Sequence, residues 1–251
     1  MTGIDVRRAF GLQLVLAALL YCAQYLIGVG YEITTGPYDV YVSFENGRLF
    51  SYLVWLAPAL AALPFATSFS ADWKSRSITA QWLRAGRRTY TRSKLIGAAL
   101  TGGLACAGGL ILFYLALLPG GHTDYYEAAF ESVGGMMEVL LNGQPVQYLA
   151  GLAVLKWLEG AYYGAAALAF SAFCPNVYLV LCFPIFMHRL TSALMRWWQA
   201  PRWMNLAMLG NGEIGLALWP TLGVGAAVFL PLIVLGSAVF ALGVRRRLEH
   251  G

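Results

Sequence analysis

Six apolar runs, each long enough to cross a lipid bilayer as a helix, occupy most of this chain. A helix that crosses the hydrocarbon core needs about 20 mainly apolar residues. The runs cover approximately residues 9–29, 49–69, 95–118, 148–172, 177–195 and 214–243. Hydrophobic residues make up 59% of the chain and charged residues 12%, about half the charged share of a typical soluble domain. The sequence therefore predicts an all-α, multi-pass membrane protein with six transmembrane helices in a single domain, residues 1–251.

A strongly basic segment, residues 70–94, separates the second and third runs. It contains seven basic residues and one acid, Asp72. Lys and Arg resist translocation, so such a loop belongs on the cytoplasmic side of the membrane. With both termini on the same side, twelve of the 17 basic residues are cytoplasmic. The residues then expected outside include Arg48, Arg196, Arg202, Glu45 and Glu213.

This charge asymmetry predicts a multi-pass protein of the cytoplasmic membrane with both termini in the cytoplasm. It also accounts for the net charge of +5. Positive loops and anionic lipid headgroups explain that charge without nucleic acid. Membrane lipid is therefore an expected partner, and nucleic acid is not.

Apolar residues recur at helical spacing inside the basic segment. Ile78, Trp82 and Leu83 predict a short amphipathic helix at the cytoplasmic face. Such a helix either fits a groove on a cytosolic protein or lies on anionic lipid. The side chains expected to make the contact are Ile78, Trp82, Leu83, Arg84, Arg87 and Arg88.

The fourth run carries two opposite charges, Lys156 and Glu159, at a spacing of three residues. Residues three apart share one face of a helix and are close enough to pair. Each charge alone costs about 2.5–3.5 kcal/mol at the centre of a membrane helix, so this face should turn toward protein or a watery cavity. Gly160 and Gly164 follow with a spacing that permits close helix contact. The pair is interpreted either as a helix seam or as part of a translocation route.

His188 and Arg189 lie in the fifth run, and we expect them in its outer third. Snorkelling of the arginine to the headgroups explains the pair, with a substrate or gating role as the alternative. Two outer elements are also expected. One is an amphipathic surface helix within residues 120–147, and the other is a short segment, 206–209, that dips into the membrane and returns.

Motifs for catalysis are missing from the sequence. It contains no GxxxxGK[ST] phosphate-binding loop, no HExxH and no GxSxG. We therefore expect no catalytic, cofactor or metal site in this chain. Any ATP hydrolysis would take place on another subunit.

Taken together, the chain resembles the transmembrane permease subunit of ABC transporters of the six-span export class, sometimes called type V. In that family a coupling helix lies in the loop between spans two and three. The matching positions here, in order, are Asp72, Thr79, Leu83, Gly86, Arg87 or Arg88, Tyr90 and Lys94. The six-span layout, the outer element between the last two spans and the Pro175-Asn176 turn agree with this resemblance.

The resemblance implies a permease that pairs with a separate ABC ATPase subunit, on which ATP and magnesium bind. It implies a homodimer, or a heterodimer with a second permease. The expected cargo is amphipathic: a lipid-like molecule, a peptide or a drug. Two other classes remain open, a membrane substrate-binding subunit of the vitamin-uptake type and an intramembrane enzyme that uses Glu159 and His188.

Overall fold

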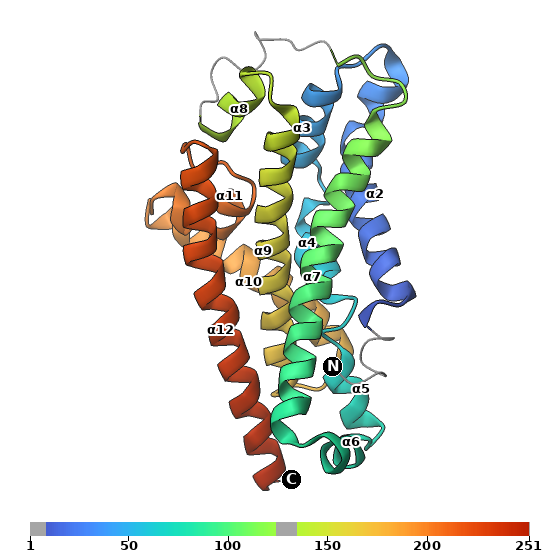
Figure 1. Cartoon of the computed structure of the whole chain (residues 1–251), viewed down its shortest axis with the longest axis vertical. Coiled ribbons are helices and arrows are strands. Elements are labelled where there is room, and N and C mark those ends of the chain that lie inside the picture. The colour runs from blue at the N-terminus through green and yellow to red at the C-terminus, as the bar shows by residue number, and fades with distance from the viewer. Residues whose placement is uncertain (1–8, 124–134, 251) are drawn as a thin grey trace.

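The computed structural model describes residues 9–123 and 135–250, and its regular elements there are helices with one isolated bridge. Five long helices run along the molecule (Figure 1). They are α2 (Leu12–Thr35), α7 (Arg87–Leu117), α9 (Pro145–Ser171), α10 (Val177–Trp197) and α12 (Leu218–His250). Within the described part, α2, α7, α10 and α12 are long and apolar enough to cross a membrane. The all-α class is therefore confirmed, and four of the six predicted spans are helices that could cross a membrane.

The second predicted span, residues 49–69, is not one continuous helix. The chain descends the bundle in short pieces (Figure 1): α3 (Val40–Phe50), η1 (Val54–Leu56), α4 (Ala57–Ala62) and α5 (Ser68–Lys74). α3 ends because Ser51 turns to an extended conformation, and its hydroxyl donates to the backbone carbonyl of Gln24 on α2. Pro64 supplies no N–H to continue α4. An apolar run of bilayer length is thus divided where a proline and a hydrogen bond to another helix interrupt it.

The fourth predicted span corresponds to α9, which is enclosed by the rest of the bundle. It packs against α7, α12, α4 and α10, and it lies between α7 and α12 in Figure 1. Seventeen of its 27 residues are buried, including Lys156 and Glu159. Lys156 and Glu159 place two charges inside α9, and burial in protein compensates for them.

Close contact between α7 and α9 depends on small residues. Gly160 of α9 faces Gly102 of α7 so closely that a Cβ on either residue would collide with the backbone carbonyl of the other. Gly164 lies in the same way against the carbonyl of Ala98. The small-residue spacing predicted for the fourth run therefore forms a helix contact, as in other membrane bundles.

We expect Gly160→Ala to destabilise the protein by about 1–3 kcal/mol, because the added methyl overpacks this backbone contact. Gly108→Ala on α7 is the matched control, since a Cβ there meets nothing within 4 Å. Thermal unfolding in detergent should show a lower midpoint for Gly160→Ala and an unchanged or higher one for Gly108→Ala. Equal midpoints for the two variants would contradict the packing argument.

The basic segment 70–94 contains the short helix predicted from its apolar spacing, α6 (Ile78–Ala85). The segment is more helical than expected, because α7 begins at Arg87, eight residues before the predicted third run. Gly86 joins the two helices with a φ of +75°, a conformation that favours glycine. The segment is therefore a tight helical turn at one end of the bundle, next to the end of α12 (Figure 1).

The opposite end of the bundle carries several short elements. Of the amphipathic helix predicted within 120–147, residues 124–134 lie outside the described part, and the remainder forms η3 (Gly135–Met137) and α8 (Glu138–Leu141). Between α10 and α12 lie η4 (Arg202–Met204) and α11 (Leu206–Gly210). Asn205 caps α11 by accepting a hydrogen bond from the Ala207 N–H at 3.1 Å. Leu206 and Leu209 are buried, so this element packs on the bundle rather than standing away from it.

Candidate functional site

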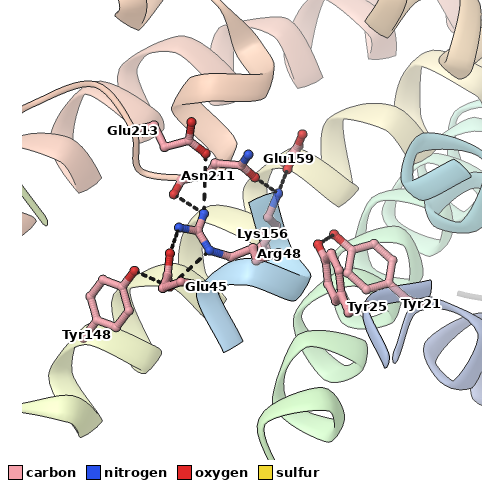
Figure 2. A network of polar contacts seen from close by, with 9 residues as sticks. All are labelled: Tyr21, Tyr25, Glu45, Arg48, Tyr148, Lys156, Glu159, Asn211 and Glu213. Atoms are coloured by element: carbon pink, nitrogen blue, oxygen red, sulfur yellow. Dashed lines mark hydrogen bonds and ion pairs between the residues drawn. The ribbon is translucent and has the colours of Figure 1, made fainter. Parts of the chain in front are cut away.

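A buried ion pair on α3 begins the main polar network (Figure 2). Glu45 and Arg48 stand three residues apart, and both are almost fully buried. The Nη2 and Nε groups of Arg48 donate to the Glu45 carboxylate. Tyr148 of α9 donates its hydroxyl to Glu45 Oε1 at 2.6 Å. The carboxylate therefore bonds both a cation on its own helix and a hydroxyl on the central helix.

The second ion pair of the network is the one predicted on α9. Lys156 Nζ donates to Glu159 Oε2 at 2.7 Å, and both side chains are buried. The same ammonium donates to Asn211 Oδ1, also at 2.7 Å. A Cβ on Gly210 would collide with the Glu159 carboxylate, so the end of α11 lies directly against that group.

Asn211 links the two ion pairs. Its side-chain oxygen accepts from Lys156, and its backbone oxygen accepts from Arg48 Nη1 at 2.6 Å. Glu213, two residues further, lies 3.8 Å from the same Nη1. Tyr21 and Tyr25 of α2, whose hydroxyls are 3.1 Å apart, are drawn beside the network in Figure 2. The connection between α11 and α12 is thus held by charges on both α3 and α9.

A cavity of about 300 Å³ adjoins this network. Its lining combines thioethers, a phenol and charged groups, a mixture suited to an amphipathic ligand. The lining residues are Arg48, Leu49, Met136, Met137, Tyr148, Arg202, Met208, Asn211, Gly212, Glu213 and Gly215. Among the residues described, no three His, Cys, Asp or Glu side chains gather as metal ligands.

We expect Glu159→Gln to lower the stability of the folded protein by about 3–5 kcal/mol, because it leaves the Lys156 ammonium buried without its counter-ion. The double variant Lys156→Met with Glu159→Gln should recover much of this loss, since no unpaired charge remains. Folded yield and thermal midpoint in detergent measure both effects. A double variant no more stable than Glu159→Gln would show that the unpaired Lys156 charge does not cause the loss of stability.

A second buried charge cluster lies at the opposite end of the bundle, around the basic segment. Asp72 of α5 and Lys94 of α7 form an ion pair with Nζ and Oδ2 2.7 Å apart, and neither side chain is exposed. Tyr90 donates its hydroxyl to the same carboxylate oxygen at 3.2 Å. The Lys94 ammonium also lies over the rings of Phe65 and Tyr90. Because Asp72 precedes α6 and Lys94 follows it, this pair closes the helical turn at its base.

The side chains predicted to contact a partner through α6 lie in different environments. Ile78 is buried in the protein's own core, in the same apolar cluster as Phe69 and Tyr90, rather than presented outward. Leu83 is 85% exposed, and Arg88 is exposed as well. The side chains of Trp82, Arg84 and Arg87 lie outside the described part of the structure. Among the side chains of α6 that the structure describes, Leu83 is therefore the large apolar one that is exposed for contact with a partner.

His188 and Arg189 of α10 lie in different surroundings. His188 is buried, and its Nδ1 lies 2.5 Å from the Tyr163 hydroxyl of α9. Tyr163 is one helical turn beyond Glu159, so His188 contacts the helix that carries the buried ion pair. Arg189 is exposed, and its guanidinium lies over the indole ring of Trp55 in η1.

Sequence reasoning missed most members of the two clusters. Glu45, Arg48 and Glu213 were assigned to outer loops, yet Glu45 and Arg48 are buried in α3. The Glu-x-x-Arg spacing, which equals that of Lys156 and Glu159, was a signal that could have predicted the α3 pair. Asn211 gave no such signal, because its role depends on contacts with two distant helices.

No family model, curated protein or solved structure matches this chain. The functional argument therefore depends on the fold, the charge pattern and the two clusters.

Proposed function

We propose that this chain is the transmembrane permease subunit of an ATP-driven ABC exporter, coupled to a separate ATPase subunit through residues 70–94. In this proposal the end of the bundle with α6 and the end of α12 faces the cytoplasm, in the cytoplasmic membrane. The cargo is an amphipathic molecule that moves outward or is extracted from the bilayer. ATP and magnesium bind to the partner subunit.

The observation that carries the proposal is the buried Asp72–Lys94 ion pair at the base of the α5–α6–α7 turn, which we call the clasp. An element that transmits movement must be attached rigidly at both of its ends. Asp72 and Lys94 provide this attachment by a fully buried ion pair, and Tyr90 adds a hydrogen bond to it. These residues are three of the positions on which the resemblance to a coupling loop rests.

The clasp connects α6 to the whole length of the bundle. α7 continues from this turn for 31 residues, and it packs closely on α9 through the glycine contact. α9 in turn carries the Lys156–Glu159 pair, which holds the connection before α12 through Asn211. A displacement of α6 by an ATPase therefore has a continuous, tightly packed path to the cavity at the far end.

We expect Leu83→Asp to weaken association with the ATPase, since it replaces an exposed apolar anchor with a charge; an anchor at an interface hot spot contributes about 2 kcal/mol or more. Ala80→Ser, a change at another exposed position of α6, is the control. The measurement is the amount of nucleotide-binding subunit that co-purifies with the tagged chain from its native membrane. The rate of ATP hydrolysis by the purified complex is measured as well. Membrane insertion should be normal for both variants.

If Leu83→Asp retained the ATPase and stimulated hydrolysis like the parent, α6 would be a lipid-surface element. If no ATPase accompanied even the parent chain, the proposed function would be wrong.

The cavity beside Arg48 favours a second candidate, a membrane substrate-binding subunit of the vitamin-uptake type. Its volume is at the lower end of the range of ligand pockets, and its lining offers polar groups of both charges. Native mass spectrometry of the complex separates the two candidates. The exporter requires two permease copies on a pair of ATPase subunits, whereas the binding subunit requires a single copy.

A further inference from the structure

Arg189 occupies an unusual position for a charged residue. α10 has 21 residues and therefore a length of about 31 Å, close to the thickness of the hydrocarbon core. Arg189 lies about 18 Å from the start of the helix and about 12 Å from its end. On the exposed row of α10 that contains it, Cys182, Phe186 and Ala193 are uncharged, and a second exposed cation, Arg196, follows two turns later. Arg196 lies in the last turn of the helix, whereas Arg189 lies well inside a candidate span.

The guanidinium lies against an aromatic side chain of another segment. It lies over the indole of Trp55, which belongs to η1. The His188 ring meets the same indole at 6.0 Å in an edge-on arrangement, and His188 is itself bonded to Tyr163. This series of contacts anchors Trp55, and through it Arg189, to the central helix α9.

Stacking on an indole occupies the face of a guanidinium and leaves its N–H edge available. Among the described residues, no carboxylate pairs with Arg189. An exposed arginine inside the membrane costs about 2.5–3.5 kcal/mol on insertion scales, and a bound anion offsets that cost. The planar N–H fork matches a carboxylate or a phosphate bidentately.

We infer that Arg189 and Trp55 form the headgroup site for an anionic amphiphile, a molecule with a carboxylate or phosphate group and an apolar chain. The apolar tail of the amphiphile lies along α10, where Phe186 is one turn and Cys182 two turns from the charge of Arg189. This inference rests on the proposed function in one respect: it assigns the amphiphile as the cargo of the permease. Binding itself does not depend on any ATPase.

The test measures binding of radiolabelled dodecyl phosphate to the purified full-length protein in a non-ionic detergent. We expect saturable binding to the parent, with little competition from dodecyltrimethylammonium, which has the same chain and the opposite charge. Arg189→Gln should weaken the binding by about tenfold or more, since a charge-assisted pair of hydrogen bonds is lost. Arg189→Lys should restore part of the affinity, because it keeps the charge without the planar fork.

Arg92→Gln is the control for the loss of a cation. Arg92 is exposed on α7, outside the proposed site, and its replacement should leave dodecyl phosphate binding unchanged. Thermal unfolding checks each variant, and Arg189→Lys carries the test if Arg189→Gln does not fold. Unchanged affinity in Arg189→Gln, or equal competition by the cationic amphiphile, overturns the inference.

Native mass spectrometry adds one further outcome. If Arg189→Gln separates a dimer into single copies while its affinity for dodecyl phosphate stays at the parental value, the residue serves a contact between chains and the inference is wrong. Absence of an ATPase from the complex, with amphiphile binding intact, would instead remove the proposed function and leave the headgroup site standing.

Discussion

The buried charges of α9 are the constraint on which the rest of the structure depends. Lys156 and Glu159 cannot face lipid, so the helix that carries them must be enclosed by protein. The other long helices supply this enclosure, and they can approach closely because Gly160 and Gly164 leave room for the backbone of α7. The ion pair therefore decides which helix is central, and the glycines decide how near its main neighbour lies.

Enclosure of α9 also explains the broken course of residues 40–74. A series of short helices can turn polar side chains such as Glu45 and Arg48 toward the centre, where Tyr148 and Asn211 complete their hydrogen bonds. A straight apolar span would instead direct most of its surface to lipid. The cost of burying four charges is met because each lies opposite a counter-ion, and Glu45, Arg48 and Lys156 each also bond a neutral group.

The two charged clusters lie at opposite ends of the bundle and serve different elements. The Asp72–Lys94 pair holds the α5–α6–α7 turn at one end, and the network around Asn211 holds the α11–α12 connection at the other. Each cluster attaches a peripheral element to long, well-packed helices. In the exporter that we propose, these are the two places where coupling to an energy source and access to cargo are controlled, and the packing of α7 on α9 lies between them.

Much of the architecture could be predicted from the sequence, because it depends on local composition and period. Run length and low charge determined the helical, membrane-spanning class, and apolar spacing determined the short helix at Ile78–Ala85. The three-residue spacing determined that Lys156 and Glu159 pair. Only the tertiary structure decided that residues 49–69 are divided, that Arg48 is buried and that Arg189 lies on Trp55. Those features depend on contacts between residues far apart in the chain, such as Ser51 with Gln24, Arg48 with Asn211 and Arg189 with Trp55, and spacing along the sequence does not show which distant residues meet.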